Sequence, residues 1–118
     1  MEAAYELVER EQRRIPAELV LAPGAATTLR GELGRALHHL NRASGGAFLV
    51  AAADLLSSTS VNAAAAGFPP GYWNAATNLE ARQLSIGGIC EDAIAGVLSG
   101  ISSFGRHVGV GSSYGAFM

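Results

Sequence analysis

The run Ala47-Phe-Leu-Val-Ala-Ala-Ala53 is apolar throughout, with no alternation of polar and apolar residues. A strand that is buried on both faces has this pattern, and such strands belong to parallel sheets that helices cover. The pair Gly45-Gly46 precedes the run, and Asp54 breaks it at its carboxyl end. Open α/β sheets place ligands at that edge, so Asp54 is a candidate site residue.

A helix is predicted before this strand. Thr27 or Thr28 can cap its beginning, because a Thr side-chain oxygen can accept a hydrogen bond from a backbone N–H of the first turn. The pair Gly45-Gly46 ends the helix. Apolar residues recur between these limits at helical spacing, which predicts one face packed on a core. These residues are Leu29, Leu33, Ala36, Leu37 and Leu40.

A second unit further along the chain repeats this order. Residues 81–86 predict a short strand, Gly87-Gly88 a turn, and residues 91–104 a helix that Gly105 closes. Residues 107–112 then predict a third strand. The buried stripe that we expect on the second helix is Ile94, Val97, Leu98 and Ile101.

This order of elements predicts a three-layer α/β/α protein with a mostly parallel sheet. Three strands are too few for a sheet that is covered on both faces, so we expect a domain that is incomplete at its C-terminus and belongs to something larger. Residues 1–25 are interpreted as an N-terminal arm or linker, and residues 26–118 as the partial domain. Residues 57–78 are rich in Ser, Asn, Gly and Pro, which predicts a long irregular loop with a function or a covering partner.

Composition narrows the class of protein. The 118 residues suffice for one small domain, and 49% hydrophobic against 15% charged residues excludes a disordered chain. A net charge of −2 and eight dispersed basic residues, all Arg, argue against nucleic-acid binding. The single cysteine, Cys90, excludes an internal disulfide, and no apolar run approaches the roughly 20 residues of a membrane span. We therefore expect a cytoplasmic protein that binds neither nucleic acid nor membrane.

The sequence gives little support to nucleotide binding, acyl transfer, metal binding or cysteine catalysis. No glycine-rich loop of the dinucleotide or Walker type is present. Gly109-Val-Gly-Ser-Ser113 invites comparison with the Gly-x-Ser-x-Gly pattern of hydrolases but is interpreted as lacking it, so an acyl-transfer triad is not expected. His38 and His39 are adjacent on a helix, so they point about 100° apart and cannot share a metal ion. Cys90 is expected to be a small hydrophobe rather than a nucleophile.

Glu91 is the most informative carboxylate in the sequence. It lies at the switch from strand to helix in Ile86-Gly-Gly-Ile-Cys-Glu-Asp92, among apolar neighbours, which predicts a partly dry site for its carboxyl group. Spacing alone leaves a simpler interpretation open, in which Glu91 is a first-turn acid that complements the helix dipole.

Four segments, taken in order, point to one family. They are Thr28-Leu-Arg30, Ala53-Asp-Leu-Leu-Ser-Ser58, Gly88-Ile-Cys-Glu91 with the following Asp-Ala-Ile-Ala-Gly-Val, and Tyr114-Gly-Ala-Phe117. From Thr28 onward, over about three-quarters of the chain, the sequence thereby resembles the pyrimidine-binding domain of transketolases, which are thiamine-diphosphate enzymes. The combination of segments is fairly specific, although each segment alone is weak.

The resemblance implies a role for each matched residue. Glu91 would hydrogen-bond the aminopyrimidine ring of the cofactor and promote its imino tautomer, which helps to deprotonate the thiazolium carbon; a carboxyl group can both donate to and accept from one ring nitrogen. Asp54 would lie near the cofactor or the substrate entrance, and Phe117 would stack on the pyrimidine. Arg30 and Ser58 would hold a sugar phosphate, which suits a guanidinium and a hydroxyl.

The function that this resemblance implies is a segment of a transketolase, which transfers a two-carbon ketol unit between sugar phosphates with thiamine diphosphate and Mg²⁺. The diphosphate-binding domain with its Gly-Asp-Gly…Asn metal motif is absent from the sequence, so the isolated chain is expected to be inactive. We expect that domain as a partner, within a homodimer or a split-subunit assembly. Asp92 stands where the family often has His or Gln, and the loop at 61–78 is longer than usual; both leave the sugar open.

Two alternatives remain open at this stage. A 2-oxoacid dehydrogenase E1-type component shares a glutamate at the same switch point, although Arg30 and the segment 54–58 favour the sugar-phosphate enzyme. A non-catalytic assembly module, with an exposed sheet edge and the long aromatic loop as its contact surfaces, is the alternative from another class.

Overall fold

The computed structural model describes residue 6 and residues 15–115. The charged stretch from Glu2 to Arg14 therefore lies almost wholly outside the described residues, and so does Phe117. Two helices and a two-stranded parallel sheet make a small mixed α/β structure. The elements in chain order are the 3₁₀ helix η1 (Ala17–Leu19), α2 (Leu29–Ala43), β1 (Phe48–Ala52), the 3₁₀ helix η2 (Val61–Ala65), α3 (Glu91–Phe104) and β2 (Val108–Ser112).

The sheet confirms two of the three predicted strands. β1 and β2 run parallel, in a register that pairs Phe48 with Val108, and β1 is buried along most of its length as its apolar run predicts. The predicted strand at 81–86 is wrong as a regular strand, because it makes only isolated parallel bridges. The N–H of Val50 donates to Arg82 O at 2.9 Å, and the N–H of Leu84 donates to Val50 O at 2.8 Å.

Residues 81–86 pair with two different segments, at one bridging residue. Gln83 bridges Val50 on one side and Tyr72 on the other, and its carbonyl accepts from the N–H of Trp73 at 2.7 Å. The side chain of Arg82 is buried and turns back to donate to Gly46 O at 2.8 Å. β1 thus has one full neighbour, β2, and one partial neighbour, the segment at 81–86.

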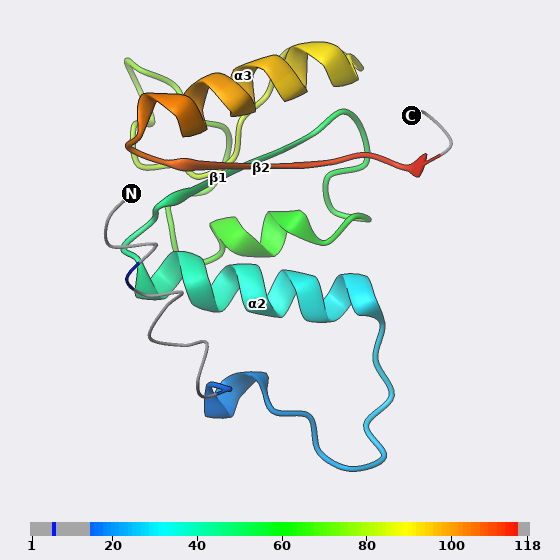
Figure 1. Cartoon of the computed structure of the whole chain (residues 1–118). Coiled ribbons are helices and arrows are strands. Elements are labelled where there is room, and N and C mark those ends of the chain that lie inside the picture. The colour runs from blue at the N-terminus through cyan, green and yellow to red at the C-terminus, as the bar shows by residue number, and fades with distance from the viewer. Residues whose placement is uncertain (1–5, 7–14, 116–118) are drawn as a thin grey trace.

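Helices cover both faces of this sheet (Figure 1). On one face α2 and η2 pack against β1 around Leu37, Val50 and Val61. On the other face α3 packs on the sheet through Ile94 and Leu98, which contact Ala51 and Ala53 in a smaller cluster. In the described part of the chain, no helix has the length and apolar character that a bilayer crossing requires.

Helix α2 begins where its cap predicts, but its first turn does not pack on the core. The Thr28 hydroxyl oxygen accepts from the N–H of Gly31 at 3.2 Å. Leu29 is 93% exposed and Leu33 is 50% exposed, so the predicted stripe is wrong at these two positions. The core begins only at Gly34, where a Cβ would lie 2.8 Å from the carbonyl oxygen of Ser60. The first turn of α2 therefore extends beyond the segment that covers it.

The predicted irregular loop at 57–78 contains a packed element instead. Within η2, Val61 and Ala64 are fully buried against α2. Asn41, also fully buried, ties the layers together: its Nδ2 donates to Ala64 O at 2.6 Å and to Phe48 O at 3.2 Å, and its Oδ1 accepts from the N–H of Phe48 at 2.8 Å. Part of the loop is thus core, and no covering partner is needed to explain it.

Helix α3 has the predicted limits, and Gly105 closes it with a φ of 87°. Its stripe is correct at Ile94 and Leu98 but wrong at Val97, which is 44% exposed. The helix lies so close to β2 that a Cβ at Gly109 would be 2.5 Å from the carbonyl oxygen of Leu98. The glycines of β2 therefore decide which side of α3 faces the sheet.

Candidate functional site

Both strands end and both helices begin at the same edge of the molecule, on the right of Figure 1. This geometry follows from parallel strands that are joined through helices, and it is the edge where open α/β sheets bind ligands. Helix N-termini also carry unpaired N–H groups and a partial positive charge, which favours anions. The residues singled out from the sequence that belong to this edge are Arg30, Asp54, Ser58 and Glu91.

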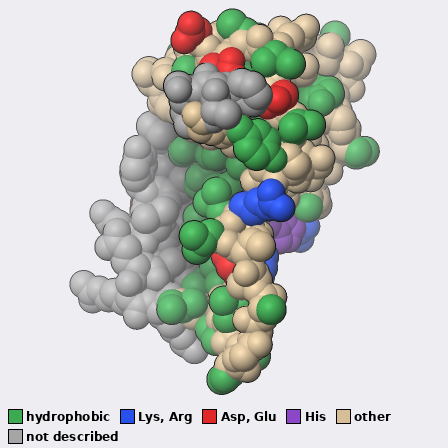
Figure 2. Space-filling model, turned by 90° about the vertical axis from the view of Figure 1, so that its right-hand side faces the viewer, with side chains coloured by type: hydrophobic (Ala, Val, Ile, Leu, Met, Phe, Trp, Pro, Cys, Tyr) green, Lys and Arg blue, Asp and Glu red, His purple; other side chains and the backbone are tan. Residues whose placement is uncertain are grey.

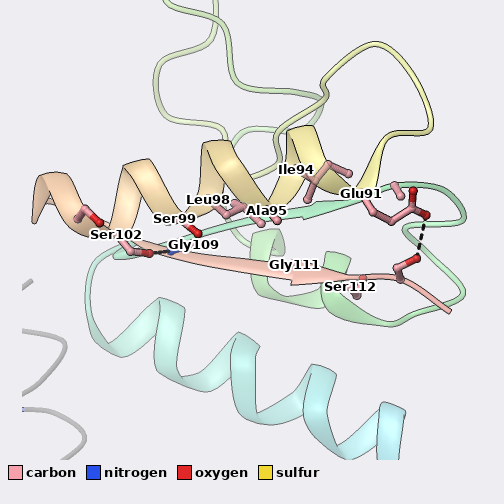
Figure 3. Close-up of a pocket in the computed structure, with 12 residues that line it drawn as sticks. Glu91, Ile94, Ala95, Leu98, Ser99, Ser102, Gly109, Gly111 and Ser112 are labelled. Atoms are coloured by element: carbon pink, nitrogen blue, oxygen red, sulfur yellow. Dashed lines mark hydrogen bonds between the residues drawn. The ribbon is translucent and has the colours of Figure 1, made fainter. Parts of the chain in front are cut away.

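Glu91 is the first residue of α3, and its side chain points toward the segment that follows β2 (Figure 3). It is half-buried, and its Oε1 accepts a hydrogen bond from the Ser113 hydroxyl at 3.2 Å. Cys90 is the N-cap residue and makes no side-chain capping bond; it is exposed, so the prediction of a small buried hydrophobe is wrong. Glu91 is therefore both a first-turn acid and a carboxylate with a specific partner, so the two interpretations of it are compatible.

An open groove of about 550 Å³ runs between α3 and β2, with Glu91 at one end (Figure 3). Its walls are mostly small residues, because Gly109 and Gly111 form the strand side and Ala95 and Ser99 lie on the helix. At both glycines an added Cβ would contact Leu98, so these residues allow α3 to pack closely on β2.

Asp54 lies two residues after the end of β1 and lines a second, separate pocket of about 260 Å³. Its Oδ1 is buried and has no hydrogen-bond partner in the described structure. Leu55, the next residue, has a left-handed backbone with a φ of 47°, which is strained for a leucine. A buried carboxylate oxygen without a donor is costly, so this pocket suits a ligand that brings an N–H or O–H group.

The predicted phosphate ligands are not joined to one another. Ser58 is half-buried, and its hydroxyl donates to Leu55 O at 3.0 Å. Because a serine has one hydroxyl hydrogen, Tyr114 must be the donor in the 2.6 Å contact between its OH and Ser58 Oγ. Arg30 is exposed in the first turn of α2, and no hydrogen bond joins it to Ser58 among the described residues.

Two functional candidates were missed from the sequence, Ser112 and Ser113. The Ser112 hydroxyl donates to Thr59 Oγ1 at 2.9 Å, and Ser113 bonds Glu91 as described above. A signal was available, since both hydroxyl residues follow a predicted strand at the same edge as Asp54.

Gly111-Ser-Ser-Tyr-Gly115 in fact matches the hydrolase pattern Gly-x-Ser-x-Gly, centred on Ser113. The geometry differs from a nucleophile elbow, because Ser113 is not among the described residues with a left-handed backbone. His107 lies before β2 and Ser113 lies after it, so about six residues of extended chain, or roughly 20 Å, separate the two. Ser113 therefore lacks the histidine base of an acyl-transfer triad within the described chain.

The histidines serve other contacts. His38 Nδ1 lies 3.2 Å from Ala63 O, and His39 Nδ1 contacts a carboxylate oxygen of Glu18. Burial lowers the pKa of His107 below its usual value, and the nearby Arg82 lowers it further. In the part of the chain that the structure covers, no three His, Cys, Asp or Glu side chains are grouped closely enough to hold a metal ion.

Figure 2 looks onto the edge where the strands end. Several acidic side chains lie near the top, over the α3 layer, and the basic and histidine side chains lie lower, where an acidic side chain is also present. In that lower part Glu32 pairs with Arg35 and Glu18 with His39, so acidic and basic side chains are mixed there. Comparison of the chain with protein-family models, with curated proteins and with solved structures found no match.

Proposed function

We propose that this chain is the pyrimidine-binding part of a transketolase-like enzyme that transfers a two-carbon ketol unit between sugar phosphates. The observation that carries the proposal is the position of Glu91, a half-buried carboxylate at the strand-end edge, with a hydroxyl donor on one oxygen and a groove beside it. The resemblance of the four sequence segments supplies the reaction class. The finer fold assignment, to a thiamine-diphosphate-binding domain, belongs to the same proposal.

The residues at this edge fit an aminopyrimidine. The Ser113 hydroxyl occupies Oε1 of Glu91, while no hydrogen bond to Oε2 is found among the described residues, so that oxygen can face a ring nitrogen. The unpartnered Oδ1 of Asp54 belongs to the separate pocket, where it can accept from a hydroxyl of a substrate. The open groove of about 550 Å³ has Glu91 in its lining, so a ring that enters the groove can reach the carboxylate. When bound, thiamine diphosphate would supply the nucleophilic carbon and the electron sink that breaking a carbon–carbon bond requires.

The chain's own residues would bind, orient and hold a proton. Glu91 would hold or release a proton at Oε2, and its partly dry position strengthens that interaction. Arg30 and the N-terminus of α2 would attract a substrate phosphate at this edge. Ser58 would join them only after its hydroxyl turns away from Leu55, since its single hydrogen is already used there.

Mg²⁺ does not fit the described residues, since no group of three metal-ligating side chains is found among them, and the diphosphate that the metal accompanies is assigned with it. The proposal therefore assigns both to a diphosphate-binding domain or subunit. The partner could be carried by the same polypeptide or by another, in a homodimer or a split-subunit assembly.

The test is ketol transfer by the natural protein, purified with every chain that accompanies it, from a ketose phosphate to an aldose phosphate. We expect Glu91→Gln to lower the rate by about 10²-fold or more, the usual contribution of a general acid or base. Asp92→Asn is the matched control, because it removes the neighbouring exposed carboxylate in the same turn. A near-normal rate for Glu91→Gln would defeat the assignment, and turnover of 2-oxoacids instead would point to an E1-type component.

A second groove beside α3, of about 590 Å³, favours one other candidate, a non-catalytic assembly module. Phe104, 78% exposed, and Val97, 44% exposed, line it together with Trp73, and β2 pairs only with β1 among the described residues. Such a surface suits a protein partner. This candidate predicts that Glu91→Ala leaves both assembly and the rate of the whole complex unchanged, whereas the catalytic proposal predicts a lost rate with assembly intact.

A further inference from the structure

We propose that Ser113 is a positioning residue for Glu91, and that Ser112 and Tyr114 anchor it on the opposite side. This inference rests on the proposed function, because it explains how the carboxylate of Glu91 would be kept in place. It concerns three consecutive side chains, each of which makes one hydrogen bond to a different element of the candidate site.

The contacts alternate as an extended backbone requires. Successive side chains of an extended segment point to opposite faces, so residues i and i+2 share a face. Ser112 and Tyr114 accordingly contact Thr59 and Ser58, at 2.9 Å and 2.6 Å, in the loop that follows β1. Ser113, between them, bonds the carboxylate at the beginning of α3 at 3.2 Å. One short segment thus joins the two layers at the edge where the ligand is expected.

The two sides of this arrangement differ in strength. The anchoring contacts have ordinary hydrogen-bond lengths, whereas 3.2 Å is long for a hydroxyl that donates to a carboxylate. Contacts of this kind are often long without a ligand and tighten in the complex. The anchors keep Ser113 within reach of Glu91 while the carboxylate retains some freedom. Ser113 therefore acts through Glu91 and need not touch the substrate.

The test compares Ser113→Ala, which removes the hydroxyl, with Ser113→Thr, which keeps it. Both are made in the natural protein with its accompanying chains, and kcat and KM for ketol transfer are measured separately. We expect Ser113→Ala to lower kcat about tenfold with KM for the sugar phosphate unchanged, since a hydrogen bond to a charged group is worth about that factor. Ser113→Thr should restore most of kcat. Ser57→Ala, an exposed serine in the same edge loop, should leave both constants unchanged.

A second readout does not depend on turnover. The midpoint temperature of unfolding, Tm, is measured for Ser113→Ala, Glu91→Gln and the double variant. If the two side chains interact, the loss of Tm in the double variant is smaller than the sum of the two single losses. Tyr114→Phe, which removes the anchoring hydroxyl, should weaken this coupling.

The outcomes separate the two proposals. A normal kcat for Ser113→Ala, or additive losses of Tm, overturns the role of Ser113 while ketol transfer by the unaltered protein sustains the proposed function. A loss of kcat that Ser113→Thr does not restore also overturns it, because a positioning hydroxyl must be replaceable by another. Absence of ketol transfer in the unaltered protein overturns the proposed function and the inference with it.

Discussion

The two faces of the sheet are built in different ways. On the α2 face, Asn41 satisfies three backbone groups of neighbouring elements, and η2 closes the core over Val50 and Val61. On the α3 face, two buried side chains, Ile94 and Leu98, hold the helix, and an open groove remains beside them. The α2 face has the larger buried cluster and a polar tie, whereas the α3 face keeps the larger free volume, next to Glu91. A layer held by buried apolar and polar contacts can thus support an adjacent layer that is more open to a ligand or partner.

The largest expected loss of stability comes from a substitution on the α2 face. Asn41→Ala leaves the N–H and the carbonyl of Phe48 and the carbonyl of Ala64 without their side-chain partner in a buried site. Several unmet backbone groups should lower the free energy of unfolding by about 3 kcal/mol. Urea unfolding followed through the single tryptophan, Trp73, measures this loss.

Asn62→Ala is the control for that experiment, because no side-chain hydrogen bond of Asn62 is found in the described structure. We expect its effect on the free energy of unfolding to be small. Equal losses for Asn41→Ala and Asn62→Ala would mean that the polar tie does not account for the stability of the α2 face.

A smaller effect is expected where α3 meets the sheet. Gly109→Ala places a Cβ 2.5 Å from the carbonyl oxygen of Leu98, so α3 must move outward. Because the open groove lets the helix shift, the loss should be about 2 kcal/mol, within the usual range for overpacking. The measurement is again the free energy of unfolding in urea.

Gly100→Ala is the matched glycine substitution in α3, since a Cβ there meets nothing within 4 Å. It should stabilise the helix by about 0.5–1 kcal/mol, because alanine is the better helix former. If Gly109→Ala were as harmless as Gly100→Ala, the α3 face would be looser than its contacts indicate.

The smallest effect concerns pH and His107, which lies at the start of β2 on the side away from the candidate site. Its pKa is lowered in the folded protein, by burial and then by Arg82, so the unfolded chain binds a proton more readily. The contribution of His107 to the free energy of unfolding is therefore present when the pH is above 6.5, the ordinary pKa of histidine, and declines as the pH falls below that value. His107→Gln should flatten the change in unfolding free energy between about pH 7.5 and 5.5. A slope identical to that of the unaltered protein would exclude this contribution.

Much of the local structure was predictable. The limits of α3, from Glu91 to Phe104, and the strand at Phe48–Ala52 follow from spacing and from glycines that end elements. The exposure of Val97 was not predictable, because helical spacing defines an apolar stripe wider than the part that the sheet covers. Likewise the 3₁₀ helix within residues 57–78 packs through alanines, which carry little pattern in a sequence rich in alanine.

The candidate site, too, was predictable only in part. Asp54 and Glu91 were found from the sequence, because each stands at the end or beginning of a predicted element at the edge where ligands bind. Ser113 was missed as a partner of Glu91, because the two residues are 22 positions apart in the chain and only the fold brings them within hydrogen-bond distance. Phe117 lies outside the described residues, so its stacking role stays a prediction.

The amino-acid sequence by itself determined the order and type of the two α-helices and of strands β1 and β2, since their apolar patterns and the residues that end them can be read within one segment. Only the tertiary structure decided which face of each helix is buried, that residues 81–86 bridge rather than continue the sheet, and that Ser112, Ser113 and Tyr114 connect two layers. Those outcomes depend on close approaches between segments far apart in the chain, such as Gly109 against Leu98, where a single Cβ changes the distance that packing allows.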